Sequence, residues 1–177
     1  GGNKPFFVYL ATNAPHGPYL VGSEWKKPYL DAGCPPQQAA FMGMVANFDW
    51  NLGRLRSYLK TEQLDSETIV VFLTDNGTSA GALFGEGGRI TGFPLDSSEN
   101  GFRRGGKSSA YEGGHRVPLF IRHYDQRLNS PKNVDALTMH FDITPTLMEL
   151  CELQRPADWP ALDGKSLVGL MGKQNTS

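Results

Sequence analysis

The apolar run from Ile69 to Leu73, which ends in the segment Thr74 to Gly77, constrains the fold more than any other part of this sequence. Five consecutive apolar residues with β-branched and aromatic members are typical of a strand buried on both faces of a parallel sheet. Two oxygen-bearing side chains and a glycine then stop the run. Because open α/β sheets bind ligands beyond the carboxyl ends of their strands, this strand end is a candidate site.

Asp75 and Asn76 place a carboxylate beside a carboxamide at this strand end. Oxygen atoms of this kind are the ligands that hard cations such as Ca²⁺ or Mg²⁺ prefer. The same two residues followed by Gly77 are also good turn formers. The tripeptide alone favours the turn, so the cation site needs support from other segments.

Two earlier segments extend the strand into a larger unit. Phe6 to Leu10 has the pattern of a buried strand, and apolar residues between Phe41 and Leu59 recur at three- and four-residue steps. The second pattern predicts a helix with one apolar face, preceded by Pro35 and Pro36. A strand, a long helix and the strand at residues 69–73 form a βαβ unit, in which the strands are expected to run parallel.

Further elements complete an α/β fold. Val117 to Ile121 has the pattern of another strand, and Thr144-Pro145 has the pattern of a helix N-cap followed by proline at the first helical position. We therefore expect an α/β fold in which a mainly parallel sheet is flanked by helices. The length of 177 residues suits a single domain over residues 1–177.

Composition limits the classes of partner. A formal net charge of −1 gives no support for a nucleic-acid surface, and no apolar run approaches the roughly 20 residues that span a bilayer. We expect neither a nucleic-acid nor a membrane partner. The two cysteines, Cys34 and Cys151, lack metal-site spacing. Whether they pair stays open, and Cys151 is expected to be buried because its surroundings are apolar.

Three further residues are candidates for chemistry beside the strand end. His16 follows the first expected strand by six residues, and Lys107 and His115 lie in or just after a glycine-rich segment. A cation, a lysine and a histidine together suit an oxyanion substrate, because positive charge neutralises it and a histidine can protonate a leaving oxygen. Taken singly, each of these residues is more often an ordinary surface residue.

Six short segments extend the pattern over nearly the whole chain in a fixed order. They are Pro5–Leu10 with Pro15-His16, Asp49–Gly53, Thr74–Gly77, Gly105–Gly114 with Arg116–Pro118, Asp142–Thr146 and Leu162–Leu167. Their order and spacing resemble the type I sulfatase family of the alkaline-phosphatase-like superfamily. The resemblance implies an alkaline-phosphatase-like fold and a sulfuric ester hydrolase.

The resemblance also implies roles for individual residues. Asp75 and Asn76 match positions that ligate Ca²⁺, and Lys107 and His16 match positions that contact the sulfate group. The histidine is expected to assist the leaving group, and His115 is expected to contact substrate because of its place in the loop. The expected substrate is a sulfated carbohydrate, in preference to an aryl sulfate ester.

The resemblance leaves one part of the family pattern unmatched. Sulfatases make a formylglycine from a Cys/Ser-x-Pro-x-Arg motif that lies upstream of every matched segment. The segment Cys34 to Gln38 has glutamine where arginine belongs, so it is rejected. We therefore expect residues 1–177 to be the second half of a catalytic domain without its nucleophile, inactive alone and able to self-associate through surface exposed by truncation. The full-length protein is expected to be secreted, periplasmic or lysosomal.

Two alternatives remain open. Phosphatases and phosphodiesterases of the same superfamily that hold two metals tend to carry histidine directly after the strand-end aspartate. Asn76 occupies that place here and favours a single hard cation. A non-catalytic glycan-binding or assembly domain that reuses the fold is the second alternative.

Overall fold

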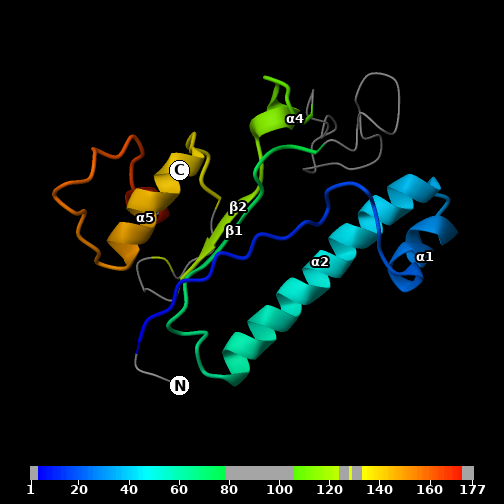
Figure 1. Ribbon diagram of the computed structural model, residues 1–177, viewed down its shortest axis with the longest axis horizontal. Coiled ribbons are helices and arrows are strands. Elements are labelled where there is room, and N and C mark those ends of the chain that lie inside the picture. Colours follow the sequence, from blue (N-terminus) through cyan, green and yellow to red (C-terminus); the bar gives the residue numbers. More distant parts are fainter. Residues whose placement is uncertain (1–3, 79–105, 124–127, 129–132, 173–177) are drawn as a thin grey trace. The chain divides into compact units, whose positions relative to one another are not determined.

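A computed structural model describes residues 4–78, 106–123, 128 and 133–172 (Figure 1). The chain divides into two compact units. Unit 1 consists of Gly1–Asp65 and Phe72–Phe120, and unit 2 consists of Ser66–Val71 and Ile121–Ser177. No helix among the described residues is long and apolar enough to cross a membrane.

The long helix predicted from the apolar periodicity is confirmed in unit 1. Helix α2 spans Pro36–Thr61, with Pro35 at its N-cap and proline at its first position, where a missing N–H costs nothing. Its buried positions are Ala39, Ala40, Gly43, Met44 and Leu59.

A shorter helix packs against α2. Helix α1 spans Ser23–Asp31, and a Cβ atom on Gly43 would lie only 3.0 Å from the Trp25 carbonyl oxygen. The missing side chain therefore lets the two helices approach closely. The Trp25 and Trp50 rings, 5.7 Å apart between centroids, extend the same contact.

The end of α2 depends on a residue that the sequence does not mark as a stop. Gln63 has φ of 56°, and the N–H of Leu64 donates to the Leu59 carbonyl at 2.8 Å. The N–H of Gln63 also donates to the Lys60 carbonyl at 3.1 Å. Together these bonds form a Schellman motif, which most often carries glycine where Gln63 stands.

The two strands predicted from apolar runs are confirmed, with bounds shifted by one or two residues. Strand β1 spans Val70–Leu73 and strand β2 spans Leu119–Arg122, and the two pair with each other. The ring centroid of Phe48 on α2 lies 5.8 Å from that of Phe72 on β1. The Phe72 centroid in turn lies 6.0 Å from the Phe120 centroid on β2. This row of three rings packs the helix against the strands in unit 1.

The direction of the strand pair follows from two contacts, one between the strands and one beyond their ends. Phe72 faces Phe120, whereas Gly77, farther along the chain, bonds to Gly114, which precedes Phe120. Residue numbers therefore rise on one strand as they fall on the other, so β1 and β2 run antiparallel. Among the described residues this is the one sheet, and a mainly parallel sheet stays a prediction.

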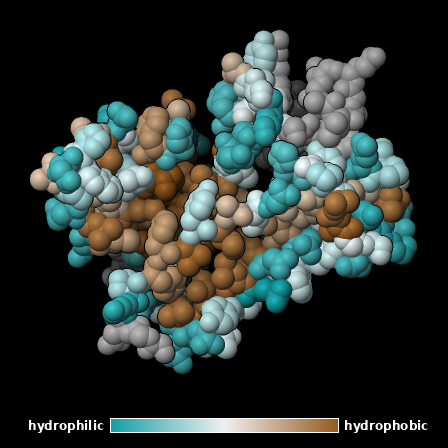
Figure 2. Space-filling view, viewed as in Figure 1, coloured by the Kyte–Doolittle hydropathy of each residue, from teal (hydrophilic) through white to brown (hydrophobic). Residues whose placement is uncertain are grey.

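The expectation of a buried strand at Phe6 to Leu10 is wrong for this structure. The segment is not part of a strand, and its side chains are exposed, Phe7 by 80% and Tyr9 by 82%. Figure 2 shows apolar side chains on the drawn face where this segment runs (blue in Figure 1). A strand needs a neighbouring backbone to pair with, and the described sheet consists of β1 and β2 alone.

Unit 2 is built around helix α5, Ile143–Leu150, which the short helix η2, His140–Asp142, precedes directly. Helix α6, Val168–Gly172, follows near the end of the described chain. Because α5 begins at Ile143, Thr144 lies inside the helix and is not its N-cap as predicted. Cys151 is exposed at the end of α5, contrary to the expected burial, and both cysteines are free.

Two polar side chains hold unit 2 together. Asp142 accepts the backbone N–H groups of Lys165 at 2.8 Å and Met139 at 2.7 Å. Thr146, only 1% exposed, donates to the Asp142 carbonyl at 2.6 Å and accepts the N–H of Leu167 at 2.9 Å. Asp142 therefore joins a distant loop to the start of α5, where it occupies the N-cap position without a side-chain capping bond.

Candidate functional site

Asp75 and Asn76 lie two and three residues beyond β1, as the sequence predicts. The backbone N–H of Asn76 donates to Asp75 Oδ1 at 2.9 Å, and Asn76 Nδ2 donates to the Gly77 carbonyl at 2.8 Å. The second bond commits the nitrogen end of the carboxamide to the backbone and leaves Oδ1 to face a ligand. Asp75 is exposed, and Asn76 is half-buried.

Three glycines, which we call the glycine cluster, bring the glycine-rich segment against this strand end. They are Gly77, Gly106 and Gly114. The N–H of Gly77 donates to the Gly114 carbonyl at 2.9 Å, and a Cβ atom on Gly77 would collide with the Gly113 carbonyl. A Cβ atom on Gly106 would lie 2.7 Å from the Thr78 carbonyl oxygen. Only glycine permits such close backbone contact, so the cluster fixes how these segments meet.

Lys107 reaches the strand end through its own backbone. Its N–H donates to the Thr78 carbonyl at 3.0 Å, two residues beyond Asn76. The side chain of Lys107 is exposed. The structure therefore brings the backbone of Lys107 beside the Asp75–Asn76 turn across a sequence separation of about thirty residues.

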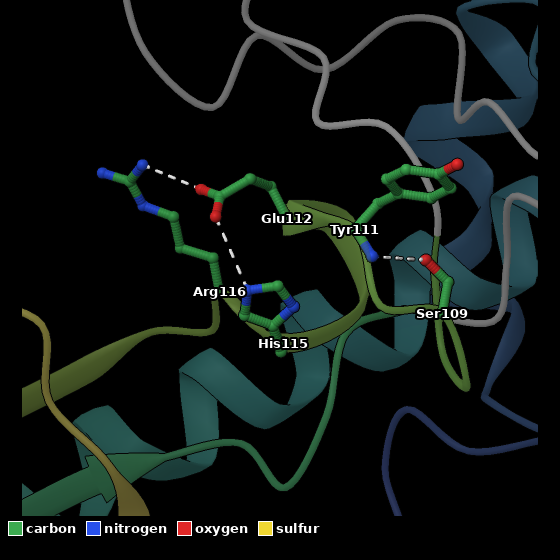
Figure 3. Close-up of polar contacts among 5 residues, drawn as sticks. All are labelled: Ser109, Tyr111, Glu112, His115 and Arg116. Atoms are coloured by element: carbon green, nitrogen blue, oxygen red, sulfur yellow. Dashed lines mark hydrogen bonds and ion pairs between the residues drawn. The ribbon is translucent and has the colours of Figure 1, made fainter.

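His115 ends the short helix α4, Glu112–His115, which directly precedes Arg116. His115 Nε2 lies 3.5 Å from Glu112 Oε1, and Arg116 Nη1 donates to Glu112 Oε2 at 3.0 Å (Figure 3). One carboxylate thus faces two basic side chains. His115 is joined to the strand end through Gly114, its neighbour in the chain, which accepts the N–H of Gly77.

His16 lies in a loop that bends back on itself, with the backbone N–H of His16 bonded to the Asn13 carbonyl at 2.8 Å. Its Nδ1 lies 2.7 Å from the Gly17 carbonyl oxygen. Since a carbonyl only accepts, Nδ1 carries the proton and Nε2 is left to face a ligand. Among the described residues, no hydrogen bond or ion pair joins His16 to the other four candidates.

The strand end fits part of a hard-cation site. Asp75 offers a carboxylate, and Asn76 offers a carboxamide oxygen whose orientation is fixed by the bond to Gly77. These are two of the six to eight oxygen ligands that Ca²⁺ takes. No group of three or more His, Cys, Asp or Glu side chains that could hold a metal occurs within the described part of the chain.

Sequence reasoning missed Glu112 and Thr78, and both matter to the site. Glu112 contacts both His115 and Arg116. Thr78 contributes its carbonyl, which carries no side-chain signal. The glycines around Lys107 were the available clue, because close backbone approach requires them.

Comparison with known proteins identifies the family. The family model described as Sulfatase matches residues 1–153. This chain belongs to the sulfatase family. The resemblance recognised from six short segments is thereby confirmed.

Similar proteins agree with this assignment. The sulfatase-family chain is 33% identical to mouse steryl-sulfatase over 95% of its own length and 24% of that protein. It is 29% identical to an N-acetylgalactosamine-6-O-sulfatase of Bacteroides thetaiotaomicron over 98% of its length and 32% of that protein. The chain thus spans about a third or less of these relatives.

A solved structure shares the fold. The crystal structure of Ps i-CgsB in complex with k-i-k-neocarrahexaose matches 95% of this chain and 34% of its own, with a TM-score of 0.77 and 27% identity. The fold of this chain therefore corresponds to part of that larger chain.

Proposed function

We propose that the full-length protein hydrolyses sulfate esters, with Asp75 and Asn76 at a cation site, Lys107 on the sulfate group and His16 on the leaving oxygen. The observation that carries the proposal is the bond from the Lys107 N–H to the Thr78 carbonyl at 3.0 Å. This bond brings the backbone of Lys107 beside the turn in which Asp75 and Asn76 offer two oxygen ligands. A cation and an ammonium group on one anionic substrate are the electrostatic arrangement that sulfate ester hydrolysis requires.

Asp75 and Asn76 would hold Ca²⁺, which would supply positive charge against the sulfate oxygens. A hard cation is favoured over zinc because both donors are oxygens and neither is an imidazole. Mg²⁺ uses the same donor type and is the second choice. This donor set also argues against the two-metal phosphatase alternative.

Lys107 would bind the sulfate through its ammonium group, and His16 would donate a proton from Nε2 to the departing oxygen. Because Nδ1 of His16 already carries a proton for the Gly17 carbonyl, a second proton on Nε2 makes the ring a cation. Such a ring both attracts the substrate and acts as the acid. A formylglycine elsewhere in the protein would supply the nucleophile.

We propose a sulfated carbohydrate as the substrate. Support comes from a relative named for N-acetylgalactosamine-6-O-sulfate and from a structural neighbour solved with a neocarrahexaose. His115, whose Nε2 faces Glu112, would contact the sugar or a second anionic group on it. A protein that acts on such polymers would be secreted, periplasmic or lysosomal.

Sulfate release by the full-length protein from sulfated monosaccharides and from an aryl sulfate tests the proposal. We expect turnover of the sulfated sugar, and Lys107→Ala should lower kcat about 100- to 1000-fold, the typical loss when one charge-stabilising donor is removed. Lys60→Ala, an exposed lysine on α2, is the matched control. Two equivalents of zinc with phosphate ester turnover would favour the phosphatase alternative, and glycan binding without turnover would favour the non-catalytic one.

A further inference from the structure

A tight turn carries Lys107. The N–H of Ser109 donates to the Gly106 carbonyl at 3.0 Å, so Lys107 and Ser108 are the two central residues of a β-turn. Ser108 has φ of 70°, in the left-handed region that residues with a side chain seldom adopt. A turn with positive φ at its second central residue is of the type that favours glycine there.

The glycine cluster holds this turn on two sides. On one side the Thr78 carbonyl oxygen accepts the N–H of Lys107 and leaves no room for a Cβ atom on Gly106. On the other side a Cβ atom on Gly114 would collide with the Ser109 carbonyl and lie 2.7 Å from the Gly106 carbonyl. The turn is therefore enclosed between Thr78, beyond the end of β1, and Gly114 in α4.

We propose that the turn Gly106–Ser109 positions the Lys107 ammonium group against the cation site, and that Ser108 is the positioning residue that sets its direction. This inference rests on the proposed function. The lysine side chain has four flexible carbons, so its reach is defined only if its backbone is fixed. A displacement of about 1 Å in such a group is enough to lower a rate about 100-fold.

The role assigned to Ser108 lies in its backbone conformation and not in its hydroxyl group. Strain of this kind persists where the surrounding structure enforces it, and here the glycine cluster does so. Glycine accepts a positive φ freely, alanine accepts it poorly, and valine, which is branched at Cβ, accepts it least. A role for the hydroxyl would instead make glycine and alanine equally harmful.

Three substitutions at one position separate these readings in the full-length protein. We expect Ser108→Gly to keep kcat within about threefold of the parent. We expect Ser108→Ala to lower it and Ser108→Val to lower it most, by about 10- to 100-fold. Ser57→Val, on an exposed position of α2, is the matched control and should leave kcat unchanged. If the Ser108→Val protein does not fold, the kcat of Ser108→Ala is compared with that of Ser108→Gly alone, and the alanine variant should have the lower kcat.

A double substitution tests whether Ser108 acts through Lys107. In a Lys107→Ala background, replacement of Ser108 by alanine or valine should cause no further loss of kcat and no further weakening of inorganic sulfate binding. Losses that add to that of Lys107→Ala would overturn the inference, as would a glycine variant no better than the alanine variant.

Inorganic sulfate binding separates this inference from the proposed function. Absence of turnover on every sulfate ester would reject the proposed function alone, and the sulfate titrations of the same variants would then decide the positioning role. If sulfate binding depends on Lys107 and falls in the order glycine, alanine, valine at position 108, the inference stands. If the parent binds no sulfate, the inference is wrong.

Discussion

Asn76 separates the candidate chemistries at the residue scale, because it supplies an oxygen where a two-metal site needs an imidazole. Its Nδ2 is held by the Gly77 carbonyl at 2.8 Å, which directs Oδ1 outward. We expect Asn76→Ala to raise the Kd for Ca²⁺ about tenfold, since losing one bond to a charged partner costs roughly 1.5 kcal/mol. Calcium titration calorimetry of the full-length protein measures this, with Asn51→Ala on α2 as the control. An unchanged Kd would remove Asn76 from the proposed site.

The charge of Asp142 contributes to the stability of unit 2. The backbone N–H groups of Lys165 and Met139 donate to its carboxylate and hold its pKa below the ordinary value. A lowered pKa in the folded state means that this carboxylate stabilises the fold fully above about pH 3.9, the ordinary aspartate value. The stabilisation is lost as the pH falls from there through the folded pKa.

Asp142→Asn should therefore destabilise the protein at pH 7, and the difference from the parent should shrink below about pH 4. Urea unfolding midpoints at pH 7, 5 and 3.5 measure this difference. Asp158→Asn, at an exposed position of the same unit, is the control and should show little effect at any pH. A gap between Asp142→Asn and the parent that stays constant across this range would contradict the role assigned to the charge.

The Schellman motif that ends α2 makes a prediction at the scale of elements. Gln63 occupies a left-handed position that costs a side-chain residue about 1–2 kcal/mol, whereas glycine pays about 0.5–1 kcal/mol in chain entropy. We therefore expect Gln63→Gly to raise the free energy of unfolding by about 0.5–1 kcal/mol. Gln37→Gly, in the first turn of α2, should instead lower it by a similar amount. Chemical denaturation checks both variants, and destabilisation by Gln63→Gly would contradict the assignment.

Thr146 links two elements inside unit 2, and its hydroxyl both donates and accepts. It bonds to the Asp142 carbonyl and to the Leu167 N–H while almost fully buried. We expect Thr146→Val to cost about 1–3 kcal/mol, because it leaves a buried N–H without a partner. Thr61→Val at the exposed end of α2 is the control in urea unfolding, and equal effects of the two changes would contradict this role.

At the scale of the whole molecule, the proposed cation site would couple ligand binding to stability. A ligand that binds only the folded state stabilises it by about 2.7 kcal/mol at 100 times its Kd. We expect Ca²⁺ to raise the thermal unfolding temperature of the full-length protein, EGTA to reverse the rise, and Asp75→Ala to abolish it. Differential scanning calorimetry with and without Ca²⁺ measures this. A rise that survives Asp75→Ala would locate the cation elsewhere.

The exposed apolar segment at Phe6 to Leu10 is the second feature at this scale. Side chains that are 58–82% exposed over five consecutive apolar residues form an extended apolar surface, which often marks an interaction site. These exposed side chains are consistent with the proposal that this 177-residue chain self-associates through its exposed apolar surface. A sedimentation experiment that finds only monomer at high concentration would contradict it.

The sequence by itself determined the features that depend on neighbours along the chain. The apolar period predicted a helix over Phe41 to Leu59, which lies inside α2, and the two apolar runs predicted β1 and β2 to within two residues. The order of short motifs was enough to identify the family. These features follow from backbone geometry and side-chain spacing within one element, which a sequence records directly.

Only the tertiary structure decided how distant segments meet. The antiparallel pairing of β1 with β2 and the exposure of Phe6 to Leu10 depend on which backbones lie beside them. Lys107 lies beside the strand end because its backbone N–H donates to the Thr78 carbonyl. No side chain in the sequence indicates this backbone bond. Glycines mark where close approach is allowed, but the partner in each contact is set by the fold, because main-chain hydrogen bonds are chemically alike at every residue.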